Sequence, residues 1–156
     1  MRLVHICLII VLSSGSLYVH ADPTDNAAAQ AFFENYVALS DAYDDKVADL
    51  YADSAVIRAC RRYPHGLERS MELSGSQWKA LLIRAMPTAR AQADRSTYSN
   101  VEVSVSGDKA TIKADRYAVR KCYTDTGYYM VVERQAHGDY LIVEEYSETQ
   151  PQSKCQ

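Results

Sequence analysis

The sequence FFENYVALSDAYDDKVADLYADSAVI, residues 32–57, decides the fold. Four apolar or aromatic residues form its stripe: Phe32, Tyr36, Leu39 and Tyr43. Their steps of four, three and four place them on one face of a helix. Asp44 or Asp45 is suited to cap a short second helix, because a carboxylate accepts from the free N–H groups at a helix start. The following Ala55–Ile57 begins a β-rich run, so the stretch predicts two helices and a first strand.

The rest of the chain predicts a third helix followed by strands. Ser74 and Gln77 have the spacing of a capping box, which opens a helix with Trp78 on its inward side. We expect Pro87 to interrupt that helix, because proline lacks an N–H and crowds the preceding turn. From residue 95 onward, alternating strands are separated by glycine turns. The apolar phase changes between Ala114 and Tyr117, which predicts a β-bulge near residues 115–116.

The opening stretch also resembles a known superfamily. Residues 36–39, the acidic corner at 44–45 and residues 50–56 are similar to the start of nuclear-transport-factor-2-like proteins, which include ketosteroid isomerases and SnoaL-like polyketide cyclases. The resemblance implies an α+β fold, a cone-shaped roll. In it, three helices pack on a strongly curved, mostly antiparallel sheet of about six strands. Residues 22–149 would form this domain and residues 150–156 a C-terminal tail.

The N-terminus has the pattern of a secretory signal peptide over residues 1–21. Arg2 supplies the positive start, residues 3–12 are apolar but too short to span a bilayer, and Ala21 offers a small residue for cleavage. A retained membrane anchor is the alternative. Cleavage predicts a secreted or periplasmic protein without a membrane span.

Three cysteines remain after residue 21: Cys60, Cys122 and Cys155. An exported protein meets an oxidising compartment, so we expect one disulfide and one unpaired cysteine. All three pairings are open from the sequence. No pair has the spacing of a redox-active motif.

Charge and motif content exclude several function classes. The net charge is −3 and no basic block is present, which argues against nucleic acid as a partner. Histidine, cysteine and carboxylate residues lack metal-ligand spacing, and no glycine-rich phosphate loop occurs. We therefore expect neither a metal nor a cofactor.

Comparison with ketosteroid isomerases concerns three positions. The catalytic tyrosine of the first helix matches Tyr36. The position of the proton-accepting carboxylate falls on Ala59, and the second acid falls near Tyr129 or Met130. The resemblance therefore implies a hollow without a proton acceptor, which argues against an enzyme and leaves the question open, with Tyr36 as the one candidate catalytic group.

Tyrosine is the compositional oddity, with twelve against two phenylalanines. A phenol combines apolar area with a hydrogen bond, which suits pocket rims and interfaces. The candidate ligand-binding set is Tyr36, Tyr51, Ala59, Arg61, Trp78, Tyr117, Tyr129 and Met130. Asp115 and Glu133 are strand carboxylates whose facing the sequence leaves open.

These observations predict an exported protein that binds a small apolar or amphipathic ligand, or a protein partner, without an evident catalytic base. Two alternatives stay open. One is an isomerase or cyclase in which Tyr36 polarises a carbonyl, and the other is a homodimeric accessory module that assembles through its sheet face.

Overall fold

The computed structural model describes residues 23–151 and Cys155, so the signal peptide expected over residues 1–21 lies outside the described residues. The helices are α1 (Pro23–Asp41), the 3₁₀ helix η1 (Asp45–Leu50) and α2 (Gly75–Ala91). The strands are β1 (Tyr51–Arg62), β2 (Glu68–Ser74), β3 (Ser96–Ser106), β4 (Lys109–Ala118), β5 (Tyr123–Asp125), β6 (Tyr129–Arg134) and β7 (Tyr140–Thr149).

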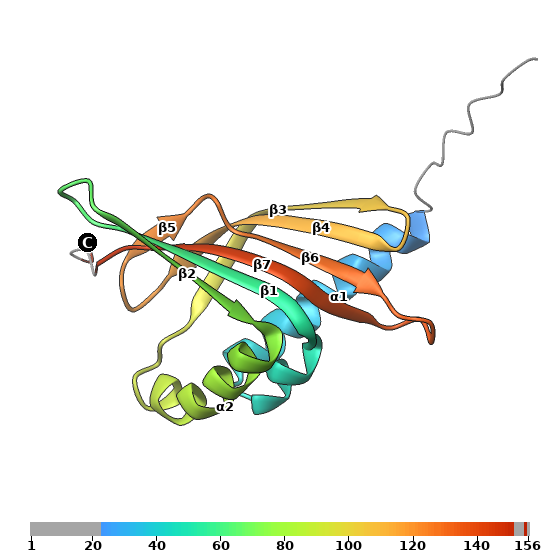
Figure 1. The fold of residues 1–156 in the computed structure, drawn as a ribbon, viewed down its shortest axis with the longest axis horizontal. Coiled ribbons are helices and arrows are strands. Elements are labelled where there is room, and N and C mark those ends of the chain that lie inside the picture. The colour runs from blue at the N-terminus through green and yellow to red at the C-terminus, as the bar shows by residue number, and fades with distance from the viewer. Residues whose placement is uncertain (1–22, 152–154, 156) are drawn as a thin grey trace, which may run out of the picture.

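One curved sheet contains all seven strands (Figure 1). Its order is β2-β1-β7-β6-β4-β3, with β5 paired to β4, and only the β1–β7 pair is parallel. In Figure 1, α1 passes behind the sheet, while α2 lies below it beside η1. The prediction of an α+β fold with three helices on a mostly antiparallel sheet is confirmed.

The helix ends follow their sequence signals. The Asp44 side chain caps η1 by accepting from the Lys46 N–H, and Ser74 and Gln77 form the expected capping box. The expected break at Pro87 was wrong, because α2 continues through it to Ala91. A proline removes one hydrogen bond from its helix, and here the flanking turns persist without that bond.

The core lies between α1 and one face of the sheet, which we call the inner face. Phe33 and Tyr36 of α1 are buried, whereas Phe32 and Leu39 are only half-buried, so Tyr36 is the one residue of the predicted stripe that α1 buries fully. Facing it, the sheet contributes fully buried apolar residues: Ile112, Met130, Val132 and Ile142. Burial of this apolar area is the main force that holds α1 on the sheet.

A bulge in β3 directs Tyr98 onto the inner face. The predicted bulge near residues 115–116 was wrong, because β4 alternates without interruption through Arg116 to the buried Ala118. The extra residue lies instead on the facing strand, between Ser99 and Glu102. Tyr98 therefore sits opposite Arg116 on the inner face.

A second bulge, in β7, has the same consequence for a carboxylate. Ile142 pairs with Val132 and Glu144 with Val131, so Val143 is the extra residue. Beyond it the alternation is reversed, and Glu145 points to the inner face opposite Met130. Bulges commonly re-aim a side chain in this way.

The three cysteines form one disulfide and leave one unpaired, as the sequence predicts. Cys122 and Cys155 form a disulfide with their Cα atoms 5.2 Å apart, and Cys60 is free and buried. The bond ties the C-terminal tail to the turn between β4 and β5. Disulfides of this kind persist in oxidising compartments.

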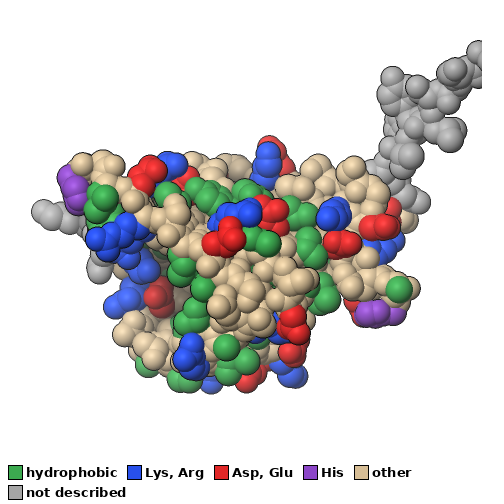
Figure 2. Space-filling view, viewed as in Figure 1, with side chains coloured by type: hydrophobic (Ala, Val, Ile, Leu, Met, Phe, Trp, Pro, Cys, Tyr) green, Lys and Arg blue, Asp and Glu red, His purple; other side chains and the backbone are tan. Residues whose placement is uncertain are grey.

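The visible surface carries charged side chains of both signs, interspersed with apolar ones (Figure 2). Within residues 23–151, none of the helices has the length and apolar character that crossing a membrane requires.

Candidate functional site

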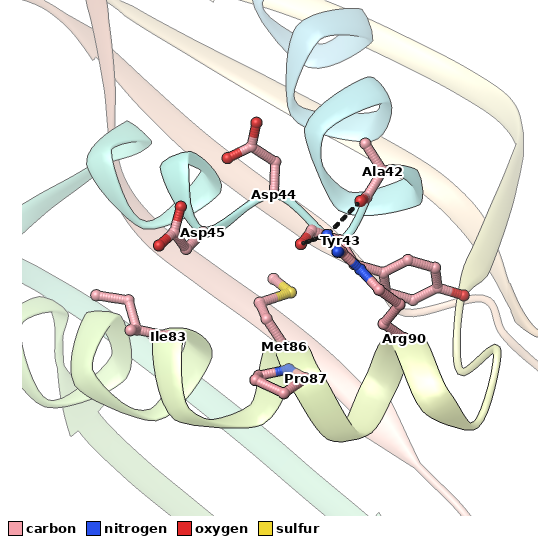
Figure 3. Close-up of a pocket in the computed structure, with 8 residues that line it drawn as sticks. All are labelled: Ala42, Tyr43, Asp44, Asp45, Ile83, Met86, Pro87 and Arg90. Carbon is pink, nitrogen blue, oxygen red and sulfur yellow. Dashed lines mark hydrogen bonds between the residues drawn. The ribbon is translucent and has the colours of Figure 1, made fainter.

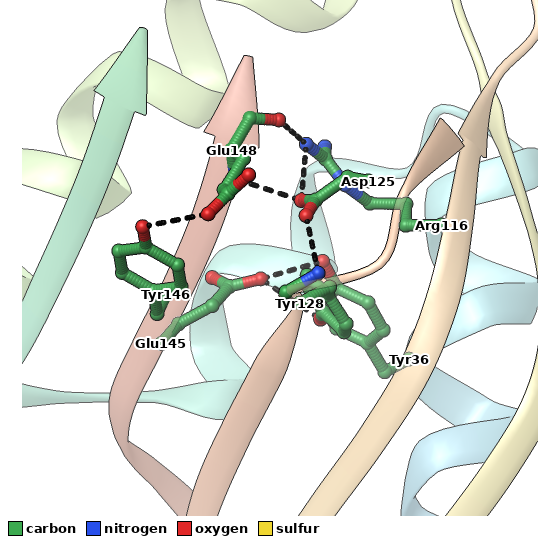
Figure 4. Close-up of polar contacts among 8 residues, drawn as sticks. Tyr36, Arg116, Asp125, Tyr128, Glu145, Tyr146 and Glu148 are labelled. Atoms are coloured by element: carbon green, nitrogen blue, oxygen red, sulfur yellow. Dashed lines mark hydrogen bonds and ion pairs between the residues drawn. The ribbon is translucent and has the colours of Figure 1, made fainter. Parts of the chain in front are cut away.

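A buried carboxylate, Glu145, lies at the centre of the inner face and is held by three tyrosine hydroxyls. Tyr51 donates to its Oε2 at 2.6 Å, while Tyr128 and Tyr36 donate to its Oε1 at 2.9 and 3.2 Å. Figure 4 shows Tyr36 and Tyr128 directed at the carboxylate. Glu145 is only 5% exposed, so these bonds replace its contact with water.

Each phenol comes from a different part of the fold. Tyr36 lies in α1, Tyr51 begins β1 and Tyr128 precedes β6. All three side chains are buried, and the partly buried Tyr98 packs on both Tyr36 and Tyr128, with ring centroids 6.5 and 5.4 Å apart. We call Glu145 with Tyr36, Tyr51 and Tyr128 the phenol cluster.

Burial controls the protonation of this cluster. Loss of hydration raises the pKa of the Glu145 carboxyl, although the hydrogen bonds from Tyr51 and Tyr128 act in the opposite direction. Burial, reinforced by the charge of Glu145, also raises the pKa of the three phenols well above 10.0. The pKa of Tyr98 rises to about 12, mainly through burial. The hydroxyls therefore remain donors at neutral pH.

A second buried carboxylate, Asp125, lies nearby and is held differently. Its Oδ2 accepts from the Glu148 N–H at 2.7 Å and from Arg116 Nη2 at 3.3 Å, and its Oδ1 accepts from the Gly127 N–H at 2.9 Å. Arg116 Nη2 also donates to the Glu148 carbonyl at 3.1 Å (Figure 4). Asp125 and Arg116 thereby join β4, β5 and the end of β7.

Arg116 also borders a hollow of about 200 Å³ between α1, α2 and the start of β3, which we call the Arg116 cavity. Its lining consists of Tyr36, Ser40, Asp41, Tyr43, Leu82, Ala85, Met86, Ala89, Asp94, Arg95, Ser96, Tyr98 and Arg116. The Nε atom of Arg116 is buried and has no hydrogen-bond partner. A buried donor in this state is uncommon and costs free energy until an acceptor reaches it.

The predicted site residues are distributed over both faces. Tyr36 and Tyr51 meet at Glu145, Trp78 packs edge-on against Tyr51 with ring centroids 6.5 Å apart, and Met130 lies beside Glu145 on the inner face. Ala59 is on the same face as Ile57, which pairs with Glu145, but it lies two residues farther along β1, opposite Ser147.

The remaining candidates lie away from the phenol cluster. Arg61 is exposed and its guanidinium sits over the Tyr63 ring. Tyr117 and Tyr129 belong to the outer face, where Tyr129 stacks on Tyr146. The two carboxylates whose facing was open, Asp115 and Glu133, are on the outer face as well, bonded to Asn100 and Lys109 respectively.

The expectation that Tyr36 has no carboxylate beside it was wrong. Ala59, the position that the resemblance assigns to the proton acceptor, carries no carboxylate, but Glu145 of the last strand reaches the Tyr36 hydroxyl. Sequence reasoning missed Tyr98 and Glu145 because the bulges in β3 and β7 reverse the alternation from which the facing of a strand residue is inferred. It missed Arg116 because a bulge was expected at residues 115–116, where β4 has none. In the part of the chain that the structure describes, no group of three or more metal-ligating side chains occurs.

Comparison with solved structures identifies the fold. A nuclear-transport-factor-2-like protein of unknown function from Pseudomonas putida superposes with a TM-score of 0.60 at 15% identity, over 81% of this chain and 87% of that one. One from Shewanella baltica, also of unknown function, gives 0.58 at 10% identity, over 88% and 99%. The chain has the nuclear-transport-factor-2-like fold.

A protein from Parabacteroides distasonis that is provisionally called a ketosteroid isomerase has the same fold, with a TM-score of 0.52 at 14% identity, over 77% of this chain and 83% of that one. No protein-family sequence model and no curated protein sequence matches this chain. At these identities the likeness establishes the nuclear-transport-factor-2-like fold and leaves the activity to the site itself.

Proposed function

We propose that this protein binds a small amphipathic molecule carrying an oxygen acceptor in the Arg116 cavity. The two walls of the cavity differ in chemistry. The α2 wall is apolar, from Leu82, Ala85, Met86 and Ala89, whereas Tyr98 and Arg116 offer polar groups from the sheet. Pockets that combine apolar walls with a few convergent polar groups are the usual form of a small-molecule site.

The observation that carries this proposal is the unpartnered Nε of Arg116. The Nη2 atom of the same guanidinium is engaged by Asp125 and the Glu148 carbonyl, so the side chain is fixed in place. A ligand oxygen that displaces the atoms covering Nε and accepts from it would relieve a penalty of about 1–3 kcal/mol. The fixed guanidinium would add little ordering cost on binding.

The location that we propose is secreted or periplasmic. The Cys122–Cys155 disulfide supports an oxidising compartment. The homodimer and the protein partner of the outer sheet face remain predictions.

Native mass spectrometry of the protein purified from the organism that makes it tests the proposal, because a retained ligand appears as added mass. A titration with methyl butyl ketone, followed by NMR amide shifts, locates the site. We expect shifts around Arg116 and Tyr98, and an Ala89→Leu variant that narrows the cavity should weaken them. Ala80→Leu, on the same helix but outside the lining, is the matched control. Equal binding by both variants would contradict the proposal.

A second candidate function, acid–base chemistry on a carbonyl compound, is favoured by the bond between Tyr36 and Glu145. Tyr36 lines the cavity and Glu145 lies behind it. In this reaction the single O–H of Tyr36 would turn from Glu145 to the ligand carbonyl oxygen, and the Glu145 carboxylate would take a proton from the carbon next to that carbonyl and return one to the same carbon. Transfer of deuterium from solvent to the carbon next to the ketone carbonyl measures this. Exchange above the rate in buffer, lost in Glu145→Gln with ketone binding retained, would support an enzyme.

A further inference from the structure

A second and larger hollow adjoins the Arg116 cavity. It has a volume of about 590 Å³ and lies between α2 and the turn that leads into η1 (Figure 3). We call it the Ile83 groove. Its lining consists of Ala42, Tyr43, Asp44, Asp45, Ile83, Met86, Pro87 and Arg90.

The two hollows share two lining residues, Tyr43 and Met86. These side chains are therefore the wall between them. In Figure 3 the Met86 side chain rises from α2 towards the turn, and the Tyr43 ring extends past Arg90, away from Asp45. Both side chains have rotatable bonds, and the unbranched methionine adapts readily to a new neighbour.

The backbone of this wall is fixed while its side chains stay adjustable. Tyr43 has a φ of 53°, in the left-handed region that a tyrosine seldom adopts. Arg90 Nη2 holds it there by donating to the carbonyls of Ala42 and Tyr43 at 3.2 and 3.0 Å. Strained backbone that is held by its surroundings is frequent beside ligand sites.

We propose that the Arg116 cavity and the Ile83 groove are two compartments of one site for an elongated, uncharged carbonyl compound. Its carbonyl oxygen accepts from Arg116 Nε, and its alkyl chain passes between Tyr43 and Met86 into the groove. This inference rests on the proposed binding function and specifies its ligand class.

The groove fits an apolar chain on its α2 side. Ile83 is 49% exposed, and Met86 and Pro87 continue the same apolar strip along the helix. Covering such exposed area is favourable at roughly 25 cal/mol per Å². Asp44 and Asp45 line the opposite side, which disfavours a chain that ends in an anion.

The charges around Arg116 favour an uncharged head. Its guanidinium already forms an ion pair with the buried Asp125, and a second buried carboxyl group, Glu145, lies in the adjoining phenol cluster. A carboxylate ligand would bring a further negative charge beside these two buried carboxyl groups. Arg95, the other cation of the lining, is exposed, so water screens its charge. A ketone, ester or amide oxygen meets the same donor without that penalty.

Two series of equal length test the inference: methyl ketones from methyl butyl to methyl octyl ketone, and the alkanoates from hexanoate to decanoate. Calorimetric titration of the full chain should show ketone affinity rising about fourfold per methylene through the whole series. Each alkanoate should bind more weakly than the ketone of its length. A plateau after methyl butyl ketone, or tighter binding of the alkanoates, would overturn the inference.

A groove variant separates this inference from the proposed function. Ile83→Asp should weaken methyl octyl ketone about tenfold and leave methyl butyl ketone unchanged, because only the longer chain reaches the groove. Leu81→Asp, at another exposed position of α2 that lines neither hollow, is the control and should change neither affinity. Equal effects of the two variants on the affinity for methyl octyl ketone would overturn the two-compartment site. The proposed function would still be supported in that case if the protein binds methyl butyl ketone. If neither ketone binds the wild-type protein, both proposals fail.

Discussion

Two buried carboxylates on the inner face of the same sheet, Asp125 and Glu145, are stabilised by opposite means. Asp125 receives a guanidinium and two backbone N–H groups. Glu145 receives three phenols. The first arrangement pairs the carboxylate with a cation and fixes the backbone, whereas the second leaves the carboxyl without an ion-pair partner.

The difference shows which carboxylate is structural. Asp125 accepts from the backbone of the β5–β6 turn and of β7, so it sets where two segments meet. Glu145 bonds only to side chains, and one of its partners, Tyr36, lines the Arg116 cavity. A change of protonation at Glu145 therefore alters the hydrogen bond of Tyr36 at the cavity wall, while Asp125 keeps the scaffold and Arg116 in place.

Removing the Asp125 carboxylate should have the largest effect. Asp125→Ala leaves Arg116 as a buried charge without its partner and two backbone donors unsatisfied, so we expect a loss of about 3–5 kcal/mol in the free energy of unfolding. Urea denaturation measures it. Asp139→Ala, whose side chain is 82% exposed, is the control and should stay within about 0.5 kcal/mol. If Asp125→Ala also changed the free energy of unfolding by less than about 0.5 kcal/mol, Asp125 would not be the structural carboxylate.

The loss of stability on removing each tyrosine hydroxyl should depend on which Glu145 oxygen that hydroxyl donates to. Oε2 accepts only from Tyr51, at 2.6 Å, whereas Oε1 accepts from both Tyr36 and Tyr128. Tyr51→Phe should therefore cost about 1.5–3 kcal/mol, and Tyr36→Phe about 0.5–1.5 kcal/mol because Tyr128 still serves that oxygen. Thermal and urea denaturation of the two variants check the ranking, and the reverse order would mean that the bond lengths do not govern the cluster.

The sequence predicts most of the scaffold and little of the site. The helix predicted from residue 32, the cap at Asp44 and the capping box at Ser74 follow from local signals, and the structure contains each of them, although α1 ends at Asp41 and Tyr43 lies in the turn beyond it. Such signals depend on neighbours within four residues, which is why a single sequence reveals them.

The site depends on two added residues that local patterns do not reveal. One lies between Ser99 and Glu102 of β3, and the other is Val143 of β7. Each extra residue reverses the facing of what lies beyond it, since side chains alternate with a period of two. Tyr36 was identified because it belongs to a helix, while Tyr98 and Glu145 were missed because their facing is set by pairing with distant strands.

The smallest effect, and the one that most directly distinguishes the two carboxylates, is a pH dependence of stability. Burial raises the pKa of Glu145 in the folded protein above its ordinary value of 4.5. The folded state then binds more protons than the unfolded state, so the stability that this group contributes is complete below about pH 4.5 and declines as the pH rises through the folded pKa. The slope is at most about 1.4 kcal/mol per pH unit.

The test compares the free energy of unfolding of the wild-type protein with that of Glu145→Gln over the same pH range. The contributions of all other titrating groups cancel in the difference. The difference in unfolding free energy, wild type minus variant, should fall with rising pH above about 4.5. Glutamine keeps an oxygen that accepts from the phenols but does not titrate. A flat difference, or one that grows with pH, would mean that the three phenols hold Glu145 as a stable anion. The comparison would then rest on the partners of the two carboxylates alone, a guanidinium and backbone N–H groups for Asp125 and three phenols for Glu145.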